Sequence, residues 1–194
     1  MSNDTVMSKA GHSRPSGRPA LRRRRPKPQI LVLGVGNALL GDDGIGGAAI
    51  ARLERERLPA RVELRDAGTS MIDVVANLGR YERVIVIDAV KIIGRARGSV
   101  VEFELGRAPA AGAFPAGSAH DFALGGLSAL ASALGLELPP VHIVGFVPVS
   151  IGLGSGLTPA ATAALDDIVA RVLRLVHEAR ARPAGAAMAP GAAR

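Results

Sequence analysis

Three side chains in this sequence have the chemical types needed to bind a divalent cation. Asp43 is the second of two adjacent aspartates that follow a strongly apolar run, Asp88 ends a second apolar run, and His120 follows a loop rich in Gly and Ala. Carboxylate and imidazole groups are common protein ligands of divalent metals. The set predicts a two-carboxylate, one-imidazole site with open positions, although spacing alone does not require the three residues to meet.

Each of the three also has a purely structural interpretation. An Asp at a helix start caps free N–H groups, which would explain one of Asp42 and Asp43. Two adjacent acids beside helix-weakening glycines are harder to explain in this way and favour a site. Asp88 could cap a turn after its strand, and His120 alone would more often be a loop residue. Binding is therefore predicted from the set rather than from any single member.

Other kinds of active site fit the sequence less well. Gly34-Val35-Gly36 resembles the start of a dinucleotide-binding loop, but Leu39 occupies the third glycine position. Two carboxylates follow where a phosphate would need positive potential. The chain has no cysteine, which excludes thiolate ligands and thiol nucleophiles. No G-x-S-x-G elbow supports a serine nucleophile, so a hydrolase would have to activate water with a metal or a carboxylate.

The net charge of +7 is located in one segment. The first 29 of the 194 residues hold eight Lys or Arg and one acid, whereas the remainder is balanced. We interpret residues 1–28 as a disordered basic tail, which makes nucleic-acid binding the less favoured explanation of the charge. The apolar run after this tail is too short for an export signal, and no stretch has membrane-spanning character. We therefore expect no membrane contact.

The pattern of apolar residues predicts alternating strands and helices. Continuous apolar runs at 29–36 and 83–88 indicate buried strands, while alternation at 61–66 indicates a strand nearer a sheet edge. Further strands are expected at 99–105 and 141–149. Helices are expected at 45–58, 71–79, 120–138 and 159–182, the last with Thr158 as its N-cap and Pro159 at its first position.

This order predicts an α/β fold in a single domain, residues 29–182, with a flexible C-terminal tail at 183–194. We expect a three-layer sandwich, in which a twisted, mostly parallel sheet of five strands lies between helices. Right-handed crossovers place the first and third strands side by side, and ligands bind beyond the carboxyl ends of strands at such a switch point. Asp43 and Asp88 are expected there.

The sequence also resembles a known family. Residues 30–46 (ILVLGVGNALLGDDGIG) are similar to the amino-terminal signature of the hydrogenase maturation endopeptidases, which process the large subunits of [NiFe]-hydrogenases. Shorter similarities follow in the family's order and bring the resemblance to residues 29–178. They are Asp66-Ala-Gly-Thr69, Val86-Ile-Asp-Ala89, Ser118-Ala-His120 with Leu124, and Gly156-Leu-Thr-Pro159.

The resemblance implies a phosphorylase/hydrolase-like fold and a specific reaction. Members remove a short C-terminal extension from the large-subunit precursor after nickel insertion, and their three metal-binding residues correspond to Asp43, Asp88 and His120. Nickel would then be carried by the substrate rather than held by the protease. The family's aspartic-type label leaves Asp43 a candidate general base. We expect a cytoplasmic monomer whose partner is the precursor.

Two other functions stay open at this stage. A metal-dependent hydrolase of another substrate could use the same three residues around its own ion. A non-enzymatic nickel carrier in hydrogenase assembly could bind metal with these residues and cut nothing.

Overall fold

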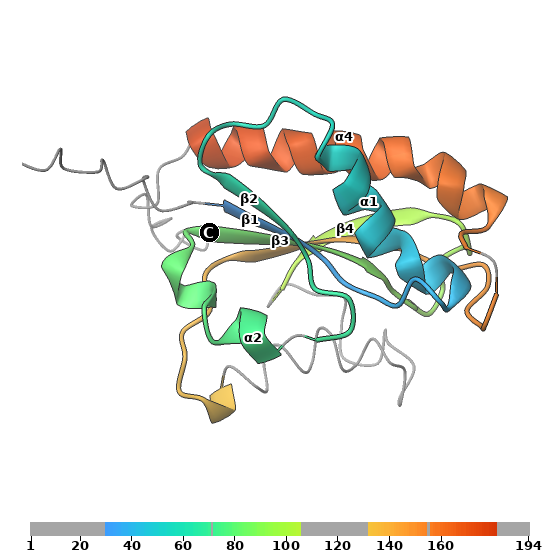
Figure 1. Cartoon of the computed structure of the whole chain (residues 1–194), viewed down its shortest axis with the longest axis horizontal. Helices are drawn as coiled ribbons and strands as arrows, with labels where there is room; N and C mark the ends of the chain where they lie inside the picture. Colours follow the sequence, from blue (N-terminus) through green and yellow to red (C-terminus); the bar gives the residue numbers. More distant parts are fainter. Residues whose placement is uncertain (1–29, 71, 106–131, 155, 182–194) are drawn as a thin grey trace, which may run out of the picture.

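The computed structural model describes residues 30–70, 72–105, 132–154 and 156–181 (Figure 1). The predicted tails, 1–28 and 183–194, lie outside these residues, as does His120. The described part contains one sheet with helices on both of its faces.

Five strands form the sheet, as predicted. They are β1 (Ile30–Gly34), β2 (Val62–Asp66), β3 (Arg83–Ala89), β4 (Val100–Glu104) and β5 (Val141–Phe146). Their spatial order is β2-β1-β3-β5-β4, and only β4, which pairs with β5, is antiparallel to its neighbour. The predicted adjacency of the first and third strands is confirmed, and β2 lies at an edge as its alternating pattern indicated.

Helices complete three layers (Figure 1). The helices α1 (Ile45–Leu53) and α4 (Pro159–Ala181) cover one face, and α2 (Ile72–Val75) with the 3₁₀ turn η2 (Leu78–Arg80) lies on the other. Side chains of β1 alternate between two cores. Ile30 and Val32 pack in the core that includes α1 and α4 side chains, whereas Leu31 and Leu33 pack in the core on the α2 side. A strand buried on both faces explains its continuous apolar run.

Several element ends differ from the prediction. Helix α1 ends at Leu53 rather than near 58, because residues 54–57 are all exposed and offer no further apolar contact to the core. The predicted helix over 71–79 is split into α2 and η2. Of the helix predicted at 120–138, residues 132–133 are helical and a turn at 134–135 follows, in which Gly135 has a φ of 64°.

A close approach of α1 to the sheet positions the loops at the carboxyl edge. The 3₁₀ turn η1 (Gly41–Gly44) leads into α1, whose first turn contains Gly46. A Cβ on Gly46 would lie 2.3 Å from the carbonyl oxygen of Val35 and 2.7 Å from that of Ile87. Glycine is therefore required for α1 to begin directly against the ends of β1 and β3.

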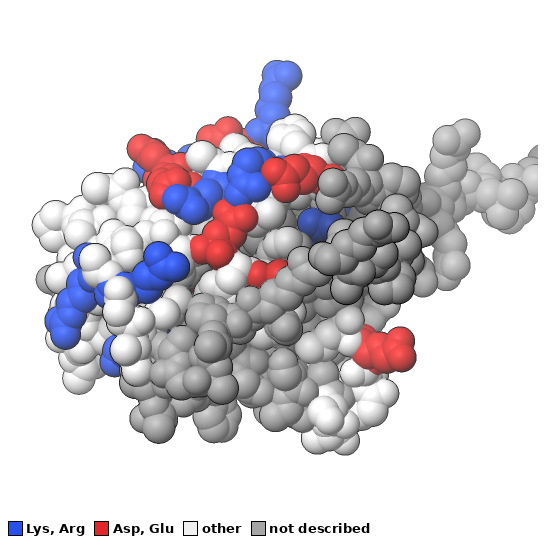
Figure 2. All heavy atoms as spheres, turned by 180° about the vertical axis from the view of Figure 1, so that it is seen from behind, with Lys and Arg blue, Asp and Glu red and all other residues white. Residues whose placement is uncertain are grey.

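Charged side chains of both signs are interspersed over α4 and the neighbouring edge strand (Figure 2). Arg174 pairs with Glu102 of β4 at 2.6 Å and with Glu178 at 2.8 Å, and Arg171 pairs with Asp167 at 2.9 Å. These are surface pairs, each worth roughly 0–1 kcal/mol. The exposed surface of α4 therefore presents both signs of charge.

Candidate functional site

The candidate site lies at the carboxyl edge of the sheet, beyond the adjacent strands β1 and β3. The N–H of Val35 donates to the carbonyl of Ile87 at 2.9 Å, which holds the chain after β1 against the end of β3. The turn η1, which contains Asp43, contacts β3, in which Asp88 is the second-last residue. Two of the three predicted ligand residues therefore stand on neighbouring elements at the predicted switch point.

Asp43 is held by the loop that follows β1. Its Oδ2 accepts a hydrogen bond of 2.8 Å from the N–H of Asn37, and its side chain is half-buried. Gly36 has a φ of 129°, and a Cβ there would lie 1.8 Å from the carbonyl oxygen of Asp43. Glycine is therefore required at position 36 because the backbone of Asp43 packs against it, and a bound dinucleotide is not needed to explain the Gly-x-Gly motif.

Asp42 has a different environment from its neighbour. Its side chain is fully buried and accepts four hydrogen bonds: from the N–H of Val149 (2.8 Å), of Ser150 (3.1 Å) and of Thr158 (2.8 Å), and from the Thr158 hydroxyl (3.1 Å). Burial acts to raise the pKa of Asp42, but the bonds from Thr158, Ser150 and Val149 outweigh it and lower that pKa below its ordinary value. Asp42 is a structural residue.

Thr158 links this cluster to helix α4. Its hydroxyl oxygen accepts a bond of 3.2 Å from the N–H of Ala161, which confirms the predicted N-cap. The same hydroxyl donates to Asp42. One buried carboxylate thus ties η1 to the loop after β5 and to the start of α4, and it leaves Asp43 alone as the ligand candidate of the acidic pair.

Asp88 is 1% exposed and is aligned with Gly145 of β5. Strand alternation places its side chain on the α2 side of the sheet, because Val84 and Val86 pack in that core. An ionised carboxylate at such a position requires hydrogen bonds or a cation to offset its burial.

A cavity of about 220 Å³ adjoins Asn37, the residue that binds Asp43. Its walls include Asp66, the last residue of β2, whose Oδ1 accepts a hydrogen bond of 2.9 Å from the N–H of Gly68. The other lining residues are Gly36, Ala38, Gly44, Gly47, Gly68 and Thr69. Asp66 is not among the site residues predicted from the sequence, although its place at the carboxyl end of a strand was a usable signal.

The third predicted ligand, His120, lies outside the described residues. The histidines within them are elsewhere. His142 is at the amino end of β5, where burial and then Arg83 lower its pKa, and His177 is exposed near the end of α4. Among described residues no three His, Cys, Asp or Glu side chains are grouped as metal ligands. The assignment of His120 stays a prediction.

Comparisons with known proteins agree with the resemblance noted from the motifs. A family model described as hydrogenase maturation protease (HycI) matches residues 48–175. The hydrogenase 2 maturation protease of Escherichia coli K12 is 33% identical over 154 residues, which cover 77% of this chain and 92% of that protein. The hydrogenase expression/formation protein HupD of Rhodobacter capsulatus is 32% identical over 151 residues, 76% of this chain and 71% of that protein.

Solved structures with the same fold include members of this group. The hydrogenase maturating endopeptidase HybD from Escherichia coli superposes with a TM-score of 0.66 and 27% identity, over 78% of this chain and 93% of that one. The solution structure of an endopeptidase from Escherichia coli gives a TM-score of 0.67 and 28% identity over the same shares. The predicted α/β fold is therefore confirmed by independent structures.

Proposed function

Since this chain belongs to the hydrogenase maturation protease family, we propose that it removes the C-terminal extension of a [NiFe]-hydrogenase large-subunit precursor. The observation that carries the proposal is the position of Asp43 and Asp88 on adjacent elements at the switch point of the sheet. The buried hydrogen bonds of the turn are made by Asp42, which leaves Asp43 as the ligand candidate of the acidic pair.

In this proposal the metal is part of the substrate. Nickel already bound in the precursor is ligated by the carboxylates of Asp43 and Asp88 and by the imidazole of His120, a ligand set of types that suit divalent nickel. These bonds position the scissile peptide beside the site and make cleavage conditional on nickel insertion. The role of His120 here rests on the family resemblance.

The proposal extends to the setting of the reaction. No helix among the described residues is long and apolar enough to cross a bilayer. The chain has no cysteine, which fits a reducing compartment. We place the protein in the cytoplasm, as a monomer, where it meets the precursor.

The test is cleavage of two forms of the precursor. Purified protein is incubated with nickel-loaded and with nickel-free large subunit, and intact-mass spectrometry records whether and where a C-terminal segment is lost. We expect cleavage of the nickel-loaded form only. Equal rates on both forms would contradict the nickel requirement.

Substitutions connect the result to the three residues. Asp43→Asn, Asp88→Asn and His120→Ala should each abolish cleavage, whereas His177→Ala, on the exposed face of α4, should leave the rate unchanged. Nickel binding without any shortened large subunit would instead favour a non-enzymatic nickel carrier. Cleavage of unrelated peptides that also depends on the three residues would favour a hydrolase with another substrate.

A further inference from the structure

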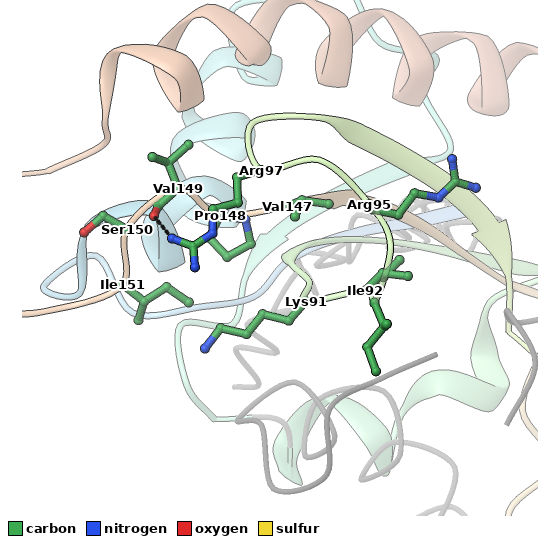
Figure 3. Close-up of a pocket in the computed structure, with 10 residues that line it drawn as sticks. Lys91, Ile92, Arg95, Arg97, Val147, Pro148, Val149, Ser150 and Ile151 are labelled. Carbon is green, nitrogen blue, oxygen red and sulfur yellow. Dashed lines mark hydrogen bonds between the residues drawn. The ribbon is translucent and has the colours of Figure 1, made fainter. Parts of the chain in front are cut away.

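A second and larger cavity, of about 470 Å³, opens at the same edge of the sheet (Figure 3). One wall is the segment after β3, and the other is the loop after β5. The residues that line it are Lys91, Ile92, Ile93, Arg95 and Arg97 from the first, and Val147, Pro148, Val149, Ser150 and Ile151 from the second.

The cavity is basic. Figure 3 shows the head groups of Lys91 and Arg97 extended toward the loop after β5, whereas Arg95 extends in the other direction. Arg97 Nη1 donates to the carbonyl of Val149 at 3.3 Å, which fixes its guanidinium at the cavity wall. Lys91 and Arg97 form no ion pair with any carboxylate of the described residues. Within the described part of the chain, neither positive charge is neutralised by a carboxylate, and both lie on the cavity wall.

The same walls expose large apolar side chains. Ile93 is 63% exposed and Val149 is 37% exposed, although both are of types that usually pack inside a protein. Two cations beside exposed apolar side chains suit a ligand that carries a negative charge next to apolar groups. A cavity of this size suits a small molecule or a few residues of peptide.

The cavity is structurally linked to the candidate site. Lys91 follows Asp88 by three residues, so their Cα atoms are separated by at most on the order of 10 Å. On the other wall, the N–H groups of Val149 and Ser150 donate to Asp42, the neighbour of Asp43. An extended peptide that reaches Asp43 and Asp88 would therefore reach this cavity within a few residues.

This cavity and the smaller one differ in the sign of the charges around them. The 220 Å³ cavity is bordered by Asp66 and adjoins the loop that holds Asp43, so that side of the edge attracts cations. The metal-bearing part of a substrate fits there, and an acidic segment is repelled from it. The basic cavity therefore suits the segment that follows the scissile bond, on the other side of that bond from the metal.

We propose that the cavity lined by Lys91, Ile93, Arg97 and Val149 is a substrate subsite that binds an acidic side chain flanked by apolar residues. That side chain belongs to the precursor's C-terminal extension, within a few residues of the cut, and the inference rests on the function proposed above. Contacts to exposed cations are weak and salt-sensitive, which allows the removed segment to leave after cleavage.

The test measures KM and kcat on nickel-loaded precursor in two forms. One form has its natural extension, and the other has every Asp and Glu of the extension replaced by Asn and Gln. Lys91→Glu should raise KM for the natural form about fivefold or more at low ionic strength, with kcat unchanged. The neutral extension should raise KM similarly for the unsubstituted protease, and the two changes together should be less than additive.

The matched control is Arg57→Glu, which makes the same charge change at an exposed position before β2, at the opposite edge of the sheet. We expect its KM to stay within about twofold, because Coulombic effects at that separation are screened. Lengthening the extension at its C-terminus moves the terminal carboxylate. If KM for the lengthened extension is unchanged, the cavity binds a side chain and not the terminal carboxylate. If KM rises as much as it does for Lys91→Glu, the terminal carboxylate is the ligand and the side-chain subsite is overturned.

The outcomes separate this inference from the proposed function. If the unsubstituted protease cuts the precursor and Lys91→Glu has the same KM, the subsite is overturned and the proposed function stands. The same holds if the extension has no acidic residue near the cut. If the precursor is not cut, the proposed function fails. Fluorescence anisotropy of a labelled extension peptide then still reports on the subsite: salt-sensitive binding weakened by Lys91→Glu supports it, and identical binding overturns it.

Discussion

At the scale of residues, two adjacent aspartates have different roles. Asp42 is fully buried and accepts four hydrogen bonds from the loop after β5 and the start of α4. Asp43 accepts one described bond, from the loop after β1, and its side chain is half-buried. Of these two neighbours in sequence, Asp42 stabilises the fold, and Asp43 lies in the turn η1 at the candidate site.

We expect substitutions to separate these roles. Asp42→Asn should lower the free energy of unfolding by about 2–4 kcal/mol, because an amide NH₂ group would face N–H donors in a buried site. Asp43→Asn keeps an oxygen acceptor for Asn37 and should cost less than about 1 kcal/mol while abolishing cleavage. Urea denaturation and the precursor assay measure the two effects. Equal losses of stability would contradict the division.

The lowered pKa of Asp42 predicts a pH dependence of stability. Because the folded-state pKa lies below the ordinary value of 3.8, the ionised carboxylate stabilises the fold at higher pH, and this contribution is lost as the pH falls below 3.8 and through the folded-state pKa. The stability difference between the natural protein and Asp42→Asn should therefore be largest near neutral pH and shrink below pH 3.8. Denaturation curves at several pH values measure it, and a constant difference would contradict the assignment.

At the scale of elements, helix α1 positions η1 by beginning against two strand ends. Gly46 lies where a Cβ would meet the backbone oxygens of Val35 and Ile87. Val35 directly follows β1, and Ile87 lies near the end of β3. Because the N–H of Val35 donates to the carbonyl of Ile87, these backbone atoms have little freedom to move. The position of α1 against the sheet, and therefore the position of Asp43 in the preceding turn, depends on residue 46 having no side chain.

We expect Gly46→Ala to lower the free energy of unfolding by about 2 kcal/mol or more. Alanine favours a helix over glycine by roughly 1 kcal/mol, but the clash with backbone atoms outweighs that gain. Gly79→Ala in η2 is the control, since a Cβ there meets nothing within 4 Å, and it should change stability by less than about 0.5 kcal/mol. Thermal and urea unfolding compare the two variants, and similar losses in both would show that crowding at Gly46 is not the cause.

At the scale of the whole molecule, the positive charge is separate from the described fold. The first 29 residues carry the excess of Lys and Arg, whereas both signs are interspersed over α4 (Figure 2). Residues 30–194 together therefore have no net charge with which to attract a polyanion over long distances.

Deletion of residues 1–28 tests this separation. We expect the melting temperature to stay within about 2 °C and precursor cleavage to continue, because the first strand begins at Ile30. Retention of the protein on a DNA column at low salt should fall, because the basic segment is gone. Loss of cleavage on deletion would give the segment a part in the reaction, and retention unchanged by deletion would locate DNA binding elsewhere.

Local sequence determined much of the fold, whereas tertiary contacts determined the different roles of Asp42 and Asp43 at the site. Continuous apolar runs predicted β1 and β3, and the order of elements predicted their adjacency and the edge at which Asp43 and Asp88 stand, because hydrophobic periodicity and crossover handedness act through local and general rules. The roles of Asp42 and Asp43 could not be separated in this way. The partners of Asp42 lie 107 to 116 residues further along the chain, and only folding brings their N–H groups to its carboxylate.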